Sequence, residues 1–493
     1  MRAALAVAVV TLLIDACAPA PSAPRPRVQW SGCGDGLECA TVTVPVDRSA
    51  PDGPTLQLAV ARYPAAGQRS GSLFFNAGFF NPGGPGLSGV EALRSRGAQL
   101  AELGAGRFDI VSWDPRGSGA SAAISCTDGE SATTYYGAAP VPADAVARTA
   151  QRTAATDFAR RCGAFNNALL AHVTTAATAR DLDRLRDLIG EARLNFYGES
   201  YGTFLGQTYA NLFPERVRAM VLDGVVDPVV NTAGAEERLV NSMTDTSHVF
   251  AEFGRLCNES GPQHCALPRA HETLAEVLDR LVSAPLPTPV GTLTYGDALV
   301  ALHSYLGTPA RWPEMAQGLA EAAAGDGMRL LSRAKNLRAG LAASIPPATG
   351  ITCVDSPARV SGATWAARLG QFTALDPIYG PLMTWWQWVP CASWPVSGAD
   401  VYAGPWSAAT EAPVLVIGTT TDPSTPYRNA RAVADLLGNA ALLTHDGFGH
   451  PSAADPSHCV TAAVRRYLLT LDVPPADAVC PSDHLPFDPD FGR

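Results

Sequence analysis

Two kinds of hydrophobic pattern alternate along the first half of the chain. Apolar positions that alternate or run continuously predict strands, and apolar positions three or four residues apart predict helices. Residues 37–46 and 56–63 predict an antiparallel hairpin. Further strands are predicted at 72–80, 108–113, 195–197 and 219–222, with helices at 176–188 and 203–213. This alternation predicts a mostly parallel, doubly wound sheet with helices on both faces.

The pattern changes after Pro228. Helical spacing then dominates, over 236–257, 271–282, 295–306 and 312–324, and is followed by an irregular, aromatic-rich stretch at 345–405. Buried strands return at 413–418 and 440–443. We therefore predict an α/β core in two parts with a mainly helical cap inserted between them. The predicted bounds are 31–228 for the first part of the core, 229–405 for the cap and 406–493 for the second part.

The N-terminal segment has the features of an export signal. Arg2 precedes an apolar run over 3–14 that is too short to span a bilayer, which predicts a signal peptide over 1–16. The sequence LIDAC that ends this run is similar to a bacterial lipobox and predicts lipidation of Cys17. Ordinary signal cleavage nearby, without lipidation, is the alternative. Residues 17–30 are then an anchor and Pro-rich stalk, and the protein is exported, either lipid-anchored at the cell surface or secreted.

The cysteines support export. The chain has eleven, and ten remain when Cys17 is set aside, an even number that predicts disulfides in an exported protein. A zinc site is the alternative, but no CxxC pair with histidine partners is present. Pairing nearest neighbours gives Cys33–Cys39, Cys126–Cys162, Cys257–Cys265, Cys353–Cys391 and Cys459–Cys480.

The composition is that of an acidic globular protein. Of 493 residues, 47% are hydrophobic and 17% charged, and the formal net charge is −10. Lys335 is the one lysine, and no basic tract exists, which argues against nucleic acid as a partner and against a basic membrane-binding patch. Contact with a membrane is expected only through the lipid anchor. We expect no metal and no cofactor, and a monomer is favoured.

The sharpest chemical signal is the sequence GESYG over 198–202. It matches the nucleophile elbow G-x-S-x-G, and it lies between a predicted strand and a predicted helix as that motif requires. The flanking glycines relieve crowding where the chain turns sharply. Ser200 is therefore the candidate nucleophile.

A serine hydroxyl needs a base to activate it. His450 follows a predicted strand and lies in a Gly-rich loop near the C-terminus, so it is the candidate base. His445 and His458 are local alternatives, the first expected at a strand end and the second at a helix start. The remaining histidines lie in helical or polar stretches, where we expect them to be solvated.

Two acids compete to orient this base. Asp223 ends one predicted strand, and Asp422 follows another in a turn-rich loop. The chain order Ser, Asp, His fits an elbow-type hydrolase with Asp422 as the acid. Asp223 is then expected to be structural.

Acyl transfer also requires donors for the developing oxyanion. One is expected to be the amide of Tyr201, the residue after the nucleophile. The other should come from the loop NPGGPG over 81–86, where Gly83 and Gly84 are joint candidates because their amides can approach a substrate closely. The alternative of a phosphate cradle lacks both a lysine and a GxGxxG pattern.

Together these motifs resemble a family. The stretches NPGGPG, DPRGSG, GESYGT, VLDGVVDP, ITCVDSP, TTTDPSTPY and GFGH run in the order found in the secreted α/β-hydrolase tripeptidyl aminopeptidases of actinobacteria, relatives of the proline iminopeptidases. The resemblance implies an α/β-hydrolase fold, a helical cap and an exopeptidase that releases short peptides. It carries the nucleophile, acid and base onto Ser200, Asp422 and His450. Residues 76–80, which duplicate a Phe-Phe-Asn run, are extra relative to that family.

Such an exopeptidase must hold the ammonium group of a peptide or protein N-terminus, which calls for carboxylates near Ser200. Glu199 and Asp355 are the main candidates, with Asp223 and Asp227 as alternatives. The Trp-Trp-Gln-Trp cluster over 385–388 either lines the substrate cleft or belongs to the cap core, and the second interpretation is favoured.

Three hypotheses for the function follow. The leading one is an exported serine exopeptidase acting on free N-termini. An exported carboxylesterase or lipase with the same three residues is the alternative, because these residues alone do not choose amide over ester. The third and weakest is a non-catalytic binding protein at the cell surface.

Overall fold

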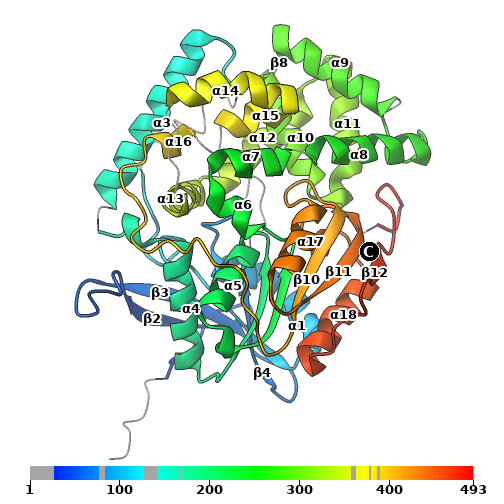
Figure 1. The fold of residues 1–493 in the computed structure, drawn as a ribbon. Coiled ribbons are helices and arrows are strands. Elements are labelled where there is room, and N and C mark those ends of the chain that lie inside the picture. The colour runs from blue at the N-terminus through cyan, green and yellow to red at the C-terminus, as the bar shows by residue number, and fades with distance from the viewer. Residues whose placement is uncertain are drawn as a thin grey trace, which may run out of the picture.

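A large central sheet with a group of helices beyond one of its edges makes up the fold (Figure 1). The computed structural model describes residues 27–76, 84–126, 141–166, 168–243, 245–267, 269–356, 362–376, 379–385 and 389–491. The predicted signal peptide and Cys17 therefore lie outside the described residues, as do Gly83 and most of the 76–80 duplication.

Ten strands of the described chain form the sheet, in the order β1-β2-β3-β5-β4-β6-β7-β10-β11-β12. The first four in this order pair antiparallel, and the pairs from β5 to β12 are all parallel. The bounds are β1 (Ser31–Gly32), β2 (Glu38–Pro45), β3 (Thr55–Tyr63), β4 (Gly71–Asn76), β5 (Phe108–Trp113), β6 (Leu194–Glu199), β7 (Val217–Asp223), β10 (Val414–Thr421), β11 (Ala440–Phe448) and β12 (Val479–Pro481). This sheet confirms the predicted hairpin and the mostly parallel architecture.

Helices pack on both faces of the sheet because its strands are apolar on both sides. Along β4, Phe74 packs into one core with helices α4, α5 and α17, while Leu73 and Phe75 pack into the other with α1 and α18. The bounds are α1 (Gly89–Leu103), α4 (Thr175–Ile189), α5 (Tyr201–Leu212), α17 (Tyr427–Leu436) and α18 (His458–Thr470). The fold is thus doubly wound, as predicted.

A third core lies in the helices between β7 and β10, which add no described strand to the main sheet. These helices are α6 (Pro228–Ala233), α7 (Ala235–Met243), α8 (Thr246–Ser260), α9 (Ala270–Ser283), α10 (Tyr295–Leu306), α11 (Trp312–Ala323), α12 (Met328–Leu341), α13 (Ile345–Asp355), α14 (Gly362–Leu375), α15 (Tyr379–Met383) and α16 (Val389–Ala392). A small hairpin, β8 (Leu286–Thr288) with β9 (Gly291–Leu293), lies among them. Figure 1 shows this group above the carboxyl ends of β10 and β11. We refer to it as the cap.

Two predictions about the cap were wrong. The continuous helix expected over 236–257 is two helices, α7 and α8. The stretch 345–405, expected to be irregular, contains four helices, α13 to α16. Prolines and glycines hide their periodicity, since α13 starts at Ile345-Pro346-Pro347 and buries nearly its whole length instead of one face.

A helix that the sequence did not predict, α3, lies alongside the cap. Helix α3 (Ala145–Phe165) belongs in sequence to the first part of the core, yet it packs against α16 and shares the apolar core of the cap (Figure 1). Its buried residues include Ala155, Phe158 and Ala159. The apolar core of the cap therefore includes residues from outside the 229–405 insertion.

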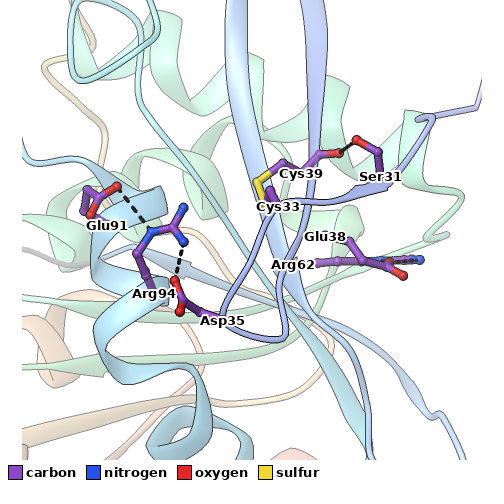
Figure 2. The surroundings of a disulfide bond; sticks show 8 residues. All are labelled: Ser31, Cys33, Asp35, Glu38, Cys39, Arg62, Glu91 and Arg94. Carbon is purple, nitrogen blue, oxygen red and sulfur yellow. Dashed lines mark hydrogen bonds and ion pairs between the residues drawn. A yellow bond between two sulfur atoms is a disulfide. The ribbon is translucent and has the colours of Figure 1, made fainter.

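All five predicted disulfides are present. Figure 2 shows Cys33–Cys39 at the start of β2, where Arg94 of α1 also bonds Asp35 of the enclosed loop. Cys353–Cys391 ties α13 to α16 inside the cap, across a sequence separation of 38. Loops of this size are stabilised by about 3–4 kcal/mol through the restricted unfolded chain. Within the part of the chain that is described, no helix is long and apolar enough to cross a bilayer.

Candidate active site

The three predicted catalytic residues gather at one edge of the sheet. Ser200 directly follows β6, Asp422 directly follows β10, and His450 lies just beyond the end of β11. The strand order β6-β7-β10-β11 places all three at the carboxyl edge, beneath the cap. This edge is where open α/β sheets form their sites.

Ser200 occupies a strained turn between β6 and α5. Its backbone has φ 53° and ψ −118°, which a residue with a side chain rarely adopts. A Cβ at Gly198 would lie 2.5 Å from the carbonyl oxygen of Gly202, and a Cβ at Gly202 would lie 2.3 Å from that of Asn76. Both glycines are therefore required for the turn, and the geometry is that of the predicted elbow.

Backbone bonds hold this turn in place. The amide of Ser200 donates to the carbonyl of Asp223 at 2.9 Å. Its carbonyl accepts from the amide of Thr203 at 2.8 Å and from the Thr203 hydroxyl at 2.6 Å. The Thr203 bonds hold the carbonyl side of the peptide between Ser200 and Tyr201. The N–H of that peptide belongs to Tyr201, at the positive end of α5.

His450 and Asp422 form a buried pair. Nδ1 of His450 lies 2.7 Å from Oδ2 of Asp422. The carboxylate is itself fixed, because Oδ1 accepts the amides of Ser424 and Thr425 at 2.7 and 2.9 Å. The Thr425 hydroxyl donates to Oδ2 at 2.8 Å and lies 3.1 Å from Nδ1. With Nδ1–H directed at Asp422, Nε2 of His450 carries the lone pair, and it has no partner among the described residues.

Charge sets the protonation of this histidine. Burial lowers the pKa of His450, but the charge of Asp422 and its hydrogen bond outweigh burial, so the pKa lies above the ordinary 6.5. The charges of Asp223 and Glu199 add to this effect. The imidazole is thus a stronger base than a free histidine.

Asp223 is structural, as the sequence predicted. Its carboxylate accepts from the Tyr197 hydroxyl at 2.8 Å and from the amide and hydroxyl of Ser452 at 3.0 and 2.6 Å. Burial raises the pKa of Asp223 to about 6, although the Ser452 bonds oppose the shift. Because its backbone also holds Ser200, Asp223 links the serine turn to the loop that carries His450.

The other two local histidines take the places expected of them. His445 lies within β11 and is fully buried, and burial lowers its pKa to about 4. His458 is the first residue of α18 and pairs with Asp483 at the surface. Neither contacts Asp422 in any described bond.

Two of the three predicted oxyanion donors, Tyr201 and Gly84, lie within the described residues. Tyr201 is the first residue of α5, and Gly84 is buried at the start of the described part of the loop. Gly83 lies outside the described residues. The loop rests against the cap, since a Cβ at Gly86 would meet the amide nitrogen of Ala348 in α13 at 2.5 Å.

Glu199, a predicted amine-binding residue, is paired with an arginine of the core. Its carboxylate is fully buried and accepts two bonds from Arg96 of α1, at 2.6 and 2.8 Å. Both carboxylate oxygens of Glu199 therefore have a cationic partner inside the protein, and amine binding by this residue stays a prediction. The alternative candidate Asp227 caps α6 by accepting the amide of Val229 at 2.9 Å.

Asp355, the other main candidate for amine binding, also has hydrogen-bond partners within the protein. It ends α13 in the cap, and its carboxylate accepts from the amide and hydroxyl of Thr175, the first residue of α4. Burial raises the pKa of Asp355 to about 6, while the Thr175 bonds and the charge of Arg238 oppose the shift. These contacts make Asp355 a junction between cap and core, and its role in amine binding stays a prediction.

The sequence missed a buried polar pair in the cap. His303 of α10 was expected to be solvated but is 3% exposed, and its ring lies 4.9 Å from that of Tyr379. Burial and the proximity of His450 lower the pKa of His303 to about 3, so the ring is neutral. An isolated histidine on an apolar helix gives no sequence signal for such a position.

One further prediction concerns the cap. Trp385 is buried in the cap core, as favoured, while residues 386–388 lie outside the described residues. No cluster of metal-ligating side chains occurs in the described part of the chain.

Comparison with known proteins identifies the family. A family model described as "alpha/beta hydrolase fold" matches residues 79–252. A second family model, described as "TAP-like protein", matches residues 376–480. Serine protease Hip1 of Mycobacterium tuberculosis is 32% identical, covering 92% of this chain and 91% of that protein. The chain belongs to the α/β-hydrolase family.

Other proteins that are similar to this chain have different names. Tripeptidyl aminopeptidase of Streptomyces coelicolor is 31% identical, over 94% of this chain and 87% of that protein. Carboxylesterase B of Mycobacterium tuberculosis is 34% identical, over 93% and 91%. A solved thermophilic esterase from Thermogutta terrifontis aligns with a TM-score of 0.37 at 12% identity, over 87% of this chain and 98% of that one. The protein is a serine hydrolase of the α/β-hydrolase fold.

Proposed function

We propose that the protein is an exported serine exopeptidase that hydrolyses peptide bonds near free N-termini and releases short peptides. The observation that carries the proposal is the site at the sheet edge. A strained Ser200 stands at the start of α5, and His450 is held 2.7 Å from Asp422. This arrangement matches acyl transfer through a serine nucleophile.

The mechanism follows from the placement of the protons. Nδ1–H of His450 is directed at Asp422, so Nε2 takes the proton of Ser200 Oγ as the oxygen attacks the scissile carbonyl. The oxyanion is stabilised by the Tyr201 amide and by an amide of the 81–86 loop, Gly83 or Gly84. His450 then protonates the leaving amine. Water, deprotonated by the same imidazole, releases the peptide from the acyl-enzyme.

Export is part of the proposal. Five disulfides are typical of proteins that fold in an oxidising compartment. The N-terminal sequence carries the signal pattern, and Cys17 is proposed as its lipidated residue. The protein is then either anchored at the cell surface or secreted.

The choice of peptide over ester rests on the family. The motifs of the chain resemble those of tripeptidyl aminopeptidases, and relatives named serine protease and tripeptidyl aminopeptidase align over most of its length. A carboxylesterase remains the second candidate, since Carboxylesterase B is 34% identical over a similar span.

A substrate panel tests the proposal. Chromogenic di-, tri- and tetrapeptide amides are compared with a free and with an acetylated N-terminus, alongside simple p-nitrophenyl esters. We expect the free tripeptide amide to give the highest kcat/KM and acetylation to abolish most of it. Equal rates on acetylated peptides together with faster turnover of esters would favour the carboxylesterase.

A variant pair tests the site itself. Ser200→Ala should remove hydrolysis of every substrate, by about a million-fold in kcat. Ser283→Ala, which changes an exposed serine of α9, is the matched control and should be as active as the parent. Hydrolysis that persists in Ser200→Ala would overturn the assignment of the nucleophile.

A further inference from the structure

A chain of hydrogen bonds connects the cap to the residue that follows the nucleophile. The Tyr201 hydroxyl lies 2.5 Å from Oγ1 of Thr175, and Oγ1 of Thr175 lies 2.6 Å from Oδ2 of Asp355. The amide of Thr175 also donates to the Asp355 carboxylate, at 3.0 Å. All three side chains are buried. The chain of bonds spans three elements, α5, α4 and α13.

The direction of these bonds follows from the groups involved. Burial and the charge of Asp355 raise the pKa of the Tyr201 phenol, so this hydroxyl keeps its proton. The Thr175 hydroxyl has one proton, which goes to the carboxylate, and its oxygen accepts from Tyr201. Asp355 is thus the terminal acceptor that orients both hydroxyls.

Helix capping alone does not account for this arrangement. Asp355 accepts the first amide of α4, which stabilises that helix. Asp355 is also the last residue of α13, and a carboxylate is unfavourable there because it lies at the negative end of its own helix. A Thr174 side chain already caps α4 by accepting the amide of Ala177. The bond to Tyr201 is an additional link that capping does not require.

That link bears on the peptide between Ser200 and Tyr201. The carbonyl of this peptide is held by Thr203, and its N–H belongs to Tyr201. The backbone at Ser200 is strained, so contacts on both sides of the peptide must maintain its orientation. Thr203 supplies one side, and the anchored side chain of Tyr201 supplies the other.

We propose that Asp355 is a positioning residue for the oxyanion site, acting through Thr175 on Tyr201. The inference rests on the proposed function of Ser200 and deepens it. The carboxylate of the cap fixes the side chain of Tyr201 and thereby keeps its amide directed at the carbonyl oxygen of the substrate. The oxyanion site is complete only when α13 is seated on α4.

Steady-state kinetics on two substrates test this inference. One is a small ester, p-nitrophenyl acetate, and the other is a free tripeptide p-nitroanilide. Tyr201→Phe removes one hydroxyl, Thr175→Val removes the middle group, and Asp355→Ala removes the terminal acceptor. Each should lower kcat about 10- to 100-fold on both substrates with little change in KM, because a misdirected donor weakens the transition state alone. Thr175→Ser keeps the hydroxyl and should be close to the parent.

A double variant tests whether the residues act together. Tyr201→Phe combined with Asp355→Ala should be no slower than the slower single variant, since either change breaks the same chain of bonds. Multiplied losses would show independent roles and overturn the inference. Tyr201→Phe with an unchanged kcat would overturn it as well, and this variant decides the question if Asp355→Ala does not fold.

Two other outcomes would replace the inference with a different role for Asp355. A loss confined to the tripeptide, with a raised KM, would show that Asp355 serves the substrate amine. A lowered Tm with an unchanged kcat would show that it only anchors α4. Activity that survives Ser200→Ala is a separate result, and it would count against the proposed function itself.

Discussion

Oγ1 of Thr425 lies within hydrogen-bonding distance of both members of the buried pair, 2.8 Å from Oδ2 of Asp422 and 3.1 Å from Nδ1 of His450. Its single proton goes to the carboxylate, because Nδ1–H of His450 is itself a donor to Asp422. Thr425 therefore fixes the carboxylate oxygen that fixes the imidazole. The sequence placed Asp422 in a turn but gave no reason to single out Thr425.

Substitutions of Asp422 and of Thr425 should lower kcat by different amounts. Asp422→Asn keeps the shape but favours the wrong tautomer of His450, and should lower kcat about 10,000-fold. Thr425→Val removes one hydrogen bond to a charged group and should cost about tenfold. Thr425→Ser retains the hydroxyl and serves as the control. Equal losses for Asp422→Asn and Thr425→Val would contradict this order.

The pH dependence of kcat/KM should report the pKa of His450. The imidazole acts as a base only when neutral, and its pKa lies above 6.5. For p-nitrophenyl acetate, which carries no amine, kcat/KM should therefore rise with pH through a midpoint above 6.5 and then level off. Asp422→Asn removes the negative charge that raises the pKa, so its midpoint should move to lower pH. Profiles of both proteins from about pH 5 to about pH 9 measure the shift. Identical midpoints would contradict the electrostatic account.

Two glycines give a matched test of the elbow. Gly202→Ala would place a Cβ 2.3 Å from the backbone oxygen of Asn76, so the turn must distort. We expect loss of activity and a free energy of unfolding lower by about 2 kcal/mol or more. Gly340 lies in α12 with no atom within 4 Å of its would-be Cβ. Gly340→Ala should leave activity intact and stabilise the helix by up to about 1 kcal/mol, as thermal unfolding would show.

His303 should make the protein sensitive to acid. Its pKa is about 3 when folded against 6.5 for an ordinary histidine, so the unfolded chain binds the proton first and stability falls as pH drops below 6.5. His303→Leu removes this penalty. Its free energy of unfolding relative to the parent should rise by about 1.4 kcal/mol for each pH unit below that point. A difference that stays constant between about pH 7.5 and about pH 5 would contradict the buried neutral state.

Local patterns were sufficient to predict much of the fold and to single out Ser200, Asp422 and His450, which the structure brings to one edge of the sheet. The elbow and the strands around it depend on residues close in sequence, where a turn leaves few alternatives. Each disulfide joins two cysteines that follow one another in the order of cysteines along the chain. The cap was predicted less well. Helical spacing of apolar residues continues across the break between α7 and α8, so the pattern does not reveal where one helix ends and the next begins. Helix α13 is buried over most of its length, so it lacks the polar face by which a helix is recognised in a sequence.

By itself the sequence determined which residues could do chemistry: a serine in a glycine elbow, an acid and a histidine after later strands, and cysteines paired by proximity. The tertiary structure alone decided what the remaining carboxylates do. Glu199 meets Arg96 across 103 residues and Asp355 meets Thr175 across 180. A buried charge must find a partner, and which one it finds depends on how distant helices pack, not on the residues beside it.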